Sequence, residues 1–236
     1  MDAPRTTTAT RLELYARTAR ALNRFFGEWT AAFCCRCLEV TARAYPEDPG
    51  ADVEVLDGQF PGCCQAGVAD TLKLPGRGEE SHLPEGLAEE LKAARAALGA
   101  SACAGPLDYT LRELRTGRVV RGRGCRHLGA DGCSLGELKR PLCLTYVCEG
   151  ICAAVDGALR SVPFGGGGDS NLFDATDTLF AVATQPRQIA EARVEALEEH
   201  LWEISDCLRT VGVTSGQELL ERWLATATAD SFRGEP

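Results

Sequence analysis

Twelve cysteines are the feature that most constrains this chain of 236 residues. A chain of this length can bury an ordinary hydrophobic core, so small size does not explain the thiols as it does in miniature disulfide-rich domains. In a reducing compartment, clustered thiols more often bind a metal or carry out redox chemistry than form six disulfides. We therefore interpret the cysteines first as ligands.

The N-terminal segment indicates where such a protein would work. Its first twenty residues lack the apolar run of a secretory signal, and no stretch approaches the ~20 apolar residues that cross a bilayer. We expect a cytoplasmic protein without a membrane partner. The alternative, an exported protein held by disulfides, would need a signal segment.

Charge narrows the range of partners. The chain has 25 Lys and Arg against 34 Asp and Glu, a formal net charge of -9. This charge repels a phosphate backbone, so we expect no bulk binding of nucleic acid. Only a local basic patch could reverse that expectation.

Apolar residues that recur at steps of three and four predict several amphipathic helices. One stripe runs from Leu12 to the first cysteines, and a second runs from Ala190 to Val211, where Gly212 ends it. Shorter helices are predicted over residues 84–98, from 169 or 170 through 180, and after a cap by Ser215 and Glu218. The first stripe consists of Leu12, Tyr15, Ala19, Leu22, Phe26, Trp29 and Phe33.

The remaining segments are less regular. Alternating residues over 109–120 predict a β-hairpin, Ser134 and Glu137 predict a capped short helix that Pro141 stops or restarts, and 46–52, 75–80 and the glycines 165–168 predict loops. The expected fold is mainly α: an irregular helical domain with a small β-hairpin and a centre pinned by cysteines and metal. Residues 1–162 would hold the first helix and the metal-binding region. Residues 169–236 would pack as helices on the same core, in one domain.

Ten of the cysteines form two clusters along the sequence. Cys34 and Cys37 have a CxxC spacing, in which one short loop can deliver two thiolates to an ion. The gaps of the second cluster match neither a zinc ribbon nor a ferredoxin. The first cluster is Cys34, Cys35, Cys37, Cys63 and Cys64, and the second is Cys125, Cys133, Cys143, Cys148 and Cys152.

Three further residues have plainer interpretations. Cys103 and Cys207 stand apart, and we expect both to act as small core residues rather than ligands. His127 follows Cys125 by two residues and could add a nitrogen ligand, although a loop histidine is more often solvated.

Residues 124–148, GCRHLGADGCSLGELKRPLCLTYVC, contain a distinctive order of residues: a cysteine, a leucine, a second cysteine after a turn, then Arg-Pro and a third cysteine. In this order the segment resembles the second half of the cysteine-cluster family known as CxxCxxCC or YkgJ-type, described as zinc- or iron-chelating proteins. Cys63 and Cys64 resemble its closing pair, separated here from Cys37 by a 25-residue insertion, and Leu144 stands where the family has an arginine. The matched residues are Cys125, Leu128, Cys133, Arg140, Pro141 and Cys143.

The resemblance implies that the thiols bind zinc or an iron-sulfur cluster; some members are labelled flagellin lysine methylases, and no particular reaction follows. Ten thiols exceed the four that one zinc ion or one cluster needs, so either two sites exist, which would use eight, or several thiols are resolving or structural. We expect either a metal-thiolate protein that supports redox or group-transfer chemistry, or a non-enzymatic module with structural zinc whose helices bind a partner. The candidate ligands are Cys34, Cys37, Cys63, Cys64, Cys125, Cys133, Cys143 and Cys148, with Cys35 and Cys152 as further candidates.

An abrupt basic segment leads into the second cluster. Six arginines occur within fifteen residues, and only Glu113 opposes them locally. They could balance the negative charge of metal-bound thiolates, dock an anionic substrate or an acidic protein partner, or cover a solvated hairpin. The residues are Arg112, Arg115, Arg118, Arg121, Arg123 and Arg126.

Overall fold

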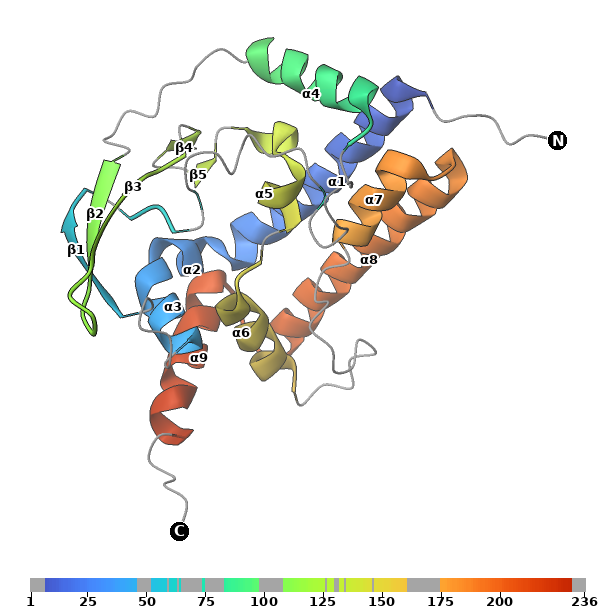
Figure 1. Cartoon of the computed structure of the whole chain (residues 1–236). Coiled ribbons are helices and arrows are strands. Elements are labelled where there is room, and N and C mark those ends of the chain that lie inside the picture. Colours follow the sequence, from blue (N-terminus) through green and yellow to red (C-terminus); the bar gives the residue numbers. More distant parts are fainter. Residues whose placement is uncertain are drawn as a thin grey trace.

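The computed structural model describes residues 7–45, 52–58, 60–62, 64, 74, 83–97, 108–125, 127–129, 132–133, 135–145, 147–160 and 175–230. Most of these residues are helical, and a small antiparallel sheet lies at one side of the helices (Figure 1). The expectation of a mainly helical fold with a small β-hairpin is confirmed. The sheet has a third strand that the sequence did not predict.

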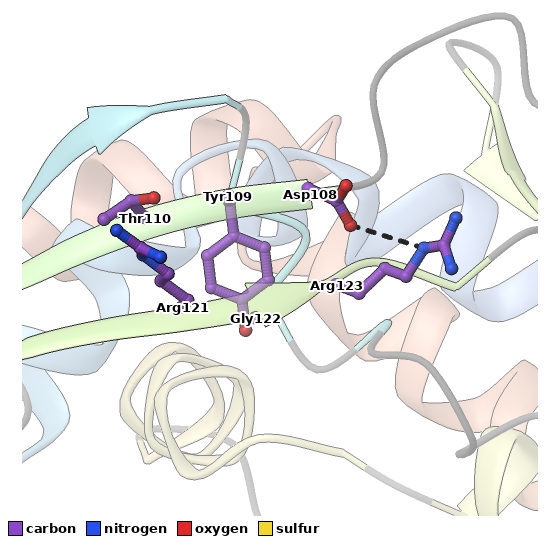
Figure 2. Close-up of a pocket in the computed structure, with 6 residues that line it drawn as sticks. All are labelled: Asp108, Tyr109, Thr110, Arg121, Gly122 and Arg123. Carbon is purple, nitrogen blue, oxygen red and sulfur yellow. Dashed lines mark ion pairs between the residues drawn. The ribbon is translucent and has the colours of Figure 1, made fainter.

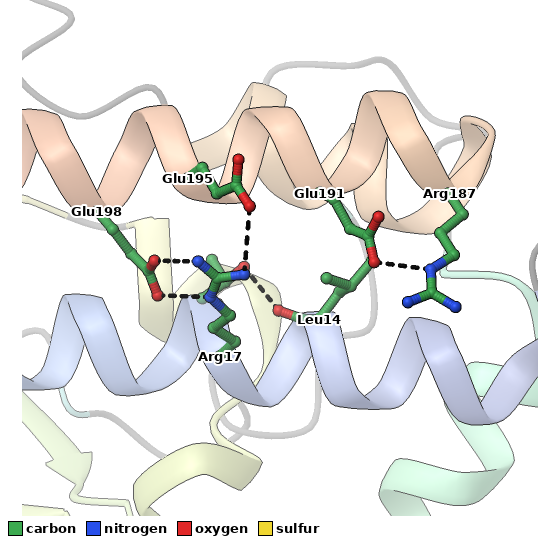
Figure 3. A network of polar contacts seen from close by, with 7 residues as sticks. Leu14, Arg17, Arg187, Glu191, Glu195 and Glu198 are labelled. Atoms are coloured by element: carbon green, nitrogen blue, oxygen red, sulfur yellow. Dashed lines mark hydrogen bonds and ion pairs between the residues drawn. The ribbon is translucent and has the colours of Figure 1, made fainter.

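Two long helices, α1 (Thr8–Trp29) and α8 (Arg187–Thr210), pack along each other (Figure 1). The predicted stripes are the faces that meet the core: Tyr15 and Leu22 on α1 and Val194 on α8 are fully buried. At the solvent edge of this pair, Arg17 donates to both carboxylate oxygens of Glu198, at 2.8 and 2.5 Å (Figure 3). Apolar periodicity thus fixes the helix pair, and the ion pair marks its rim.

The first predicted helix is interrupted at Thr30. Its hydroxyl donates to the carbonyl of Phe26 at 3.0 Å, a bond that bends helices because it competes with the backbone ladder. A short helix α2 (Ala31–Cys35) follows, and then α3 (Cys37–Ala44). The break places the first cysteines on two short helices instead of at the end of one long one.

One hydrophobic core joins the early and late parts of the chain. Its buried residues come from α1, α4 (Glu85–Ala97), α5 (Pro141–Thr145), α6 (Glu149–Leu159), α7 (Ala175–Thr184), α8 and α9 (Gly216–Asp230). At its centre the indole of Trp29 donates to the Ser205 hydroxyl at 2.9 Å. The glycine stop of α8 at Gly212 and the cap of α9 by Ser215 and Glu218 are as predicted.

The sheet has the order β1 (Val53–Asp57), β2 (Asp108–Glu113) and β3 (Val119–Arg123), with antiparallel neighbours. Leu111 in the central strand pairs with Val55 on one side and Val120 on the other. Strand β2 buries Tyr109, Leu111 and Glu113, which share one face of the strand. A second, minimal pair, β4 (Leu128–Gly129) and β5 (Gly132–Cys133), lies close to α5 (Figure 1).

The segment around Pro141 is partly as expected. A 3-10 turn (Gly136–Leu138) precedes α5, which begins at Pro141, so the proline restarts a helix. By length and composition alone Pro141–Leu159 could cross a membrane, a test that core helices also pass, and here Leu144 and Val155 are fully buried in the core. The predicted capping residue Ser134, the glycines 165–168 and the start of the helix before Ala175 lie outside the described residues.

Candidate functional site

Several short helices carry cysteines of the two clusters. Cys34 and Cys35 end α2, Cys37 begins α3, Cys143 lies in α5, and Cys148 and Cys152 lie at the start of α6. In Figure 1, α2, α3 and α6 lie near one another below α5 and the β4–β5 pair. No disulfide joins any two of the cysteines whose side chains the structure describes.

The segment before Cys64 packs directly on Cys37. A Cβ built on Gly62 would lie 2.8 Å from the Cys37 Sγ, and the backbone of Gly62 has a φ of +62°, which side chains rarely adopt. The amide of Cys64 then donates to the Pro61 carbonyl at 3.1 Å. Glycine at position 62 therefore lets this turn reach the start of α3.

Main-chain contact links the first cysteine cluster to the second. The amide of Cys125 donates to the Cys64 carbonyl at 2.7 Å. Cys125 is buried against Leu135, and both Cys64 and Cys143 pack on that pair. Cys64 is consequently the residue through which the two clusters meet.

Electrostatic interactions identify a second group of thiols, which includes Cys64 and acts on Cys34. Desolvation by the surrounding protein, followed by the nearby thiols of Cys64 and Cys148, raises the pKa of Cys34 to about 12, even though the residue keeps an exposed edge. Cys37 and Cys35 act in the same direction. Like charges so close to one another disfavour ionisation, so the Cys34 thiol stays protonated in the metal-free protein.

Cys148 lies at the N-terminus of α6, with extended backbone at φ −72° and ψ 151°. Desolvation raises its pKa, and the amides of Ile151 and Gly150 oppose that rise. Desolvation, followed by the thiol of Cys148, raises the pKa of Cys152 to about 11. A helix N-terminus favours a thiolate, so Cys148 is well placed to give up its proton to a metal.

The structure does not describe the side chains of two predicted ligands, and it gives a third a neighbour other than a thiol. Cys63, like Cys103, lies outside the described residues, and for Cys133 only the backbone is described, paired with Leu128. His127, the candidate nitrogen ligand, has its Nε2 3.2 Å from Nη2 of Arg95. Within the described part of the chain, no three Cys, His, Asp or Glu side chains form a ready-made metal site. Cys207 packs against the core from α8, in agreement with its interpretation as a core residue.

The arginines of the hairpin have acidic neighbours that only folding supplies. Arg112 contacts Glu54 at 3.1 Å, Arg123 contacts Asp108 at 3.3 Å, and Arg118 pairs with the buried Glu113. Arg123 and Asp108 line an open pocket of about 430 Å³, together with Arg121 and Tyr109. Figure 2 shows these side chains and the ion pair between Arg123 and Asp108. Arg126 lies outside the described residues.

A buried polar group next to Cys143 was missed by sequence reasoning. Arg140 precedes α5 and is buried, and Tyr15 of α1 is fully buried close to it. Desolvation, and after it the Cys143 thiol, raises the pKa of Tyr15, whereas the charges of Arg140 and Arg95 oppose that rise. The only sequence signal was the Arg-Pro pair of the resemblance, which gave Arg140 no role.

No known protein family matches this chain, and neither does any curated protein or solved structure. The resemblance to the CxxCxxCC family therefore stays a prediction.

Proposed function

We propose that this chain binds zinc or an iron-sulfur cluster through thiolates of α2, α3, α5, α6 and the turn before Cys64. The observation that carries the proposal is the position of Cys64. Its main chain bonds to Cys125, its side chain packs beside Cys125 and Cys143, and its thiol acts on Cys34. Segments far apart in the sequence thus direct their thiols to one region.

Thiol chemistry makes a metal the natural occupant of such a group. Neighbouring thiols repel one another as anions, and desolvation penalises each anion separately. A divalent ion or an iron-sulfur core reverses both effects, because it binds thiolates at ~2.3 Å and takes four of them. Cys34, Cys37, Cys64 and Cys148 are our preferred set, because Cys34 interacts electrostatically with each of the others. Cys63, Cys125, Cys133 and Cys143 would complete this site or form a second one.

Two uses of the metal have support. Cys34 and Cys35 are exposed, so a metal bound by them would have an accessible edge for redox or group-transfer chemistry. Cys125 is buried, which suits the alternative, a closed zinc site that stabilises the fold of an interaction module. Either use needs reduced thiols, so we further propose a cytoplasmic location.

The test is anaerobic purification followed by metal analysis and absorption spectroscopy. We expect stoichiometric metal, brown with broad visible absorption for an iron-sulfur cluster and colourless for zinc. The variant Cys37→Ser should lose most of the metal. Cys207→Ser is the matched control, because Cys207 is a half-buried cysteine of α8 that packs against the hydrophobic core. This variant should keep the metal. A metal-free parent protein, or equal metal in both variants, would reject the proposal.

A further inference from the structure

Arg140 is a charged side chain in an unusual place. It is 8% exposed, and among the buried residues of the described chain only Arg140 and Glu113 carry a formal charge. Glu113 has its counter-charge in Arg118. Burial of a guanidinium is unfavourable unless negative charge lies near it, and a guanidinium cannot escape by losing its proton.

The backbone before Arg140 is attached firmly to α1. The Tyr15 hydroxyl donates to the Lys139 carbonyl at 2.7 Å, and the Lys139 Nζ donates to Asn23 Oδ1 at 2.5 Å. Glu137 pairs with Arg20 at 2.8 Å. These contacts hold the main chain of Arg140 in position without help from any sulfur.

Arg140 and Cys143 belong to the same turn. The carbonyl of Arg140 accepts the amide of Leu144 at 3.2 Å, which starts α5 and holds Cys143 within one helical turn of the arginine. Both groups act electrostatically on the buried Tyr15, as does Arg95 from α4. Arg95 also approaches His127, so a second guanidinium and an imidazole lie in the same neighbourhood.

We propose that Arg140, supported by Arg95, balances from the buried side the negative charge of a metal-thiolate centre to which Cys143 contributes, either by completing the preferred set or in a second site. This inference rests on the proposed function. Four thiolates on a divalent ion leave a net charge of about −2, and nearby cations stabilise such a centre. Arg140 suits this role because it is buried and its main chain lies within one helical turn of Cys143. Arg140 acts through Cys143 and is a positioning residue.

The test compares zinc affinities of the full-length chain by competition with a colorimetric zinc indicator. Arg140→Met removes the charge and keeps an unbranched side chain, Arg140→Lys restores the charge, and Arg112→Met is the control on the hairpin surface. We expect Arg140→Met to weaken zinc binding by about 10- to 100-fold, as loss of an outer-shell partner does. Arg140→Lys should recover most of the affinity, and Arg112→Met should stay close to the parent.

Coupling between Arg140 and Cys143 in zinc affinity distinguishes the proposed role from a merely structural one, which would not produce it. In a Cys143→Ser background, Arg140→Met should cause little further loss, because the thiolate it serves is gone. Unchanged affinity in Arg140→Met, no rescue by lysine, or fully additive losses would each overturn the inference while leaving metal binding intact. Should Arg140→Met not fold, Arg95→Met and Arg140→Lys carry the comparison, with a smaller loss expected for Arg95→Met and near-parent affinity for Arg140→Lys. A parent protein that binds no metal would reject the proposed function itself.

Discussion

Replacement of Gly150 by alanine tests whether close packing between α3 and α6 holds Cys37 near Cys148. A Cβ on Gly150 would lie well under 3.0 Å from Cγ1 of Val40, closer than real side chains approach, and 3.1 Å from Cη2 of Trp223, a tight contact. Val40 is 2% exposed, and a β-branched side chain has few other rotamers, so it cannot move aside. Overpacking of this kind costs about 1–3 kcal/mol.

Gly157 provides the matched control because it lies in the same helix and a Cβ there would meet nothing within 4 Å. Gly157→Ala should stabilise the protein by about 0.4–1 kcal/mol through the helix propensity of alanine and its less flexible unfolded chain. In urea unfolding followed by circular dichroism, Gly150→Ala should therefore be less stable than Gly157→Ala by about 1–3 kcal/mol. This difference corresponds to roughly 2–12 °C in melting temperature for a domain of this size.

The double variant Val40→Ala with Gly150→Ala should recover part of the lost stability, because the clashing methyl is gone. Gly150→Ala should also bind less zinc than Gly157→Ala, because α3 carries Cys37 and the start of α6 carries Cys148. Equal unfolding free energies for the two glycine variants would refute the packing argument. Unequal stability with equal zinc binding would refute only its link to the thiols.

Three further predictions concern single contacts. Ser205→Ala removes the hydrogen-bond acceptor of the buried Trp29 indole and should lower the free energy of unfolding, measured in urea, by about 1–3 kcal/mol. A loss below about 0.5 kcal/mol, as for a surface change, would contradict the role of this hydrogen bond. Bonds from the amide and hydroxyl of Thr214, with Arg222, lower the pKa of Glu218 to about 2, so its contribution to stability is present above its ordinary pKa and is lost as pH falls toward 2. Glu218→Gln should accordingly melt below the parent at pH 7 and converge with it in acid, whereas a constant difference across this range would refute the assignment. Zinc added to the metal-free protein at pH 7 should release about one proton for each thiol bound, because desolvation and neighbouring thiols keep Cys34 and Cys148 protonated. An indicator dye measures the proton release. Zinc binding without proton release would exclude thiolate ligands.

The sequence predicts the elements whose residues repeat with a clear period. Helix α8 and most of α1 follow from their apolar stripes, and the hairpin follows from alternation on both sides of a turn. The break at Thr30 was not predicted because neither glycine nor proline marks it. Strand β1 was missed because its residues are mostly exposed, so its strand geometry comes from pairing with β2.

The candidate site is predictable in composition but not in arrangement. Clustering of cysteines identified the segments that carry the candidate ligands, yet the contact of Cys64 with Cys125 depends on how the sheet folds between them. The neighbourhood of Arg140 could not be predicted, because Tyr15 and Arg95 reach it from helices that precede it by many residues. Sequence spacing carries no information on such contacts, since only tertiary packing creates them.

The bond from the Cys125 amide to the Cys64 carbonyl closes a loop of about sixty residues. Closing such a loop from an unfolded chain costs roughly 3–4 kcal/mol in entropy. An ion that bound thiols at both ends of an open loop would have to close the loop, and its binding free energy would be less favourable by that amount. Here the main chain closes the loop, so under the proposed function the two cysteine clusters would act as one multidentate ligand whose ends are already joined. A ligand of that kind discriminates between ions by size and preferred geometry as well as by affinity for sulfur.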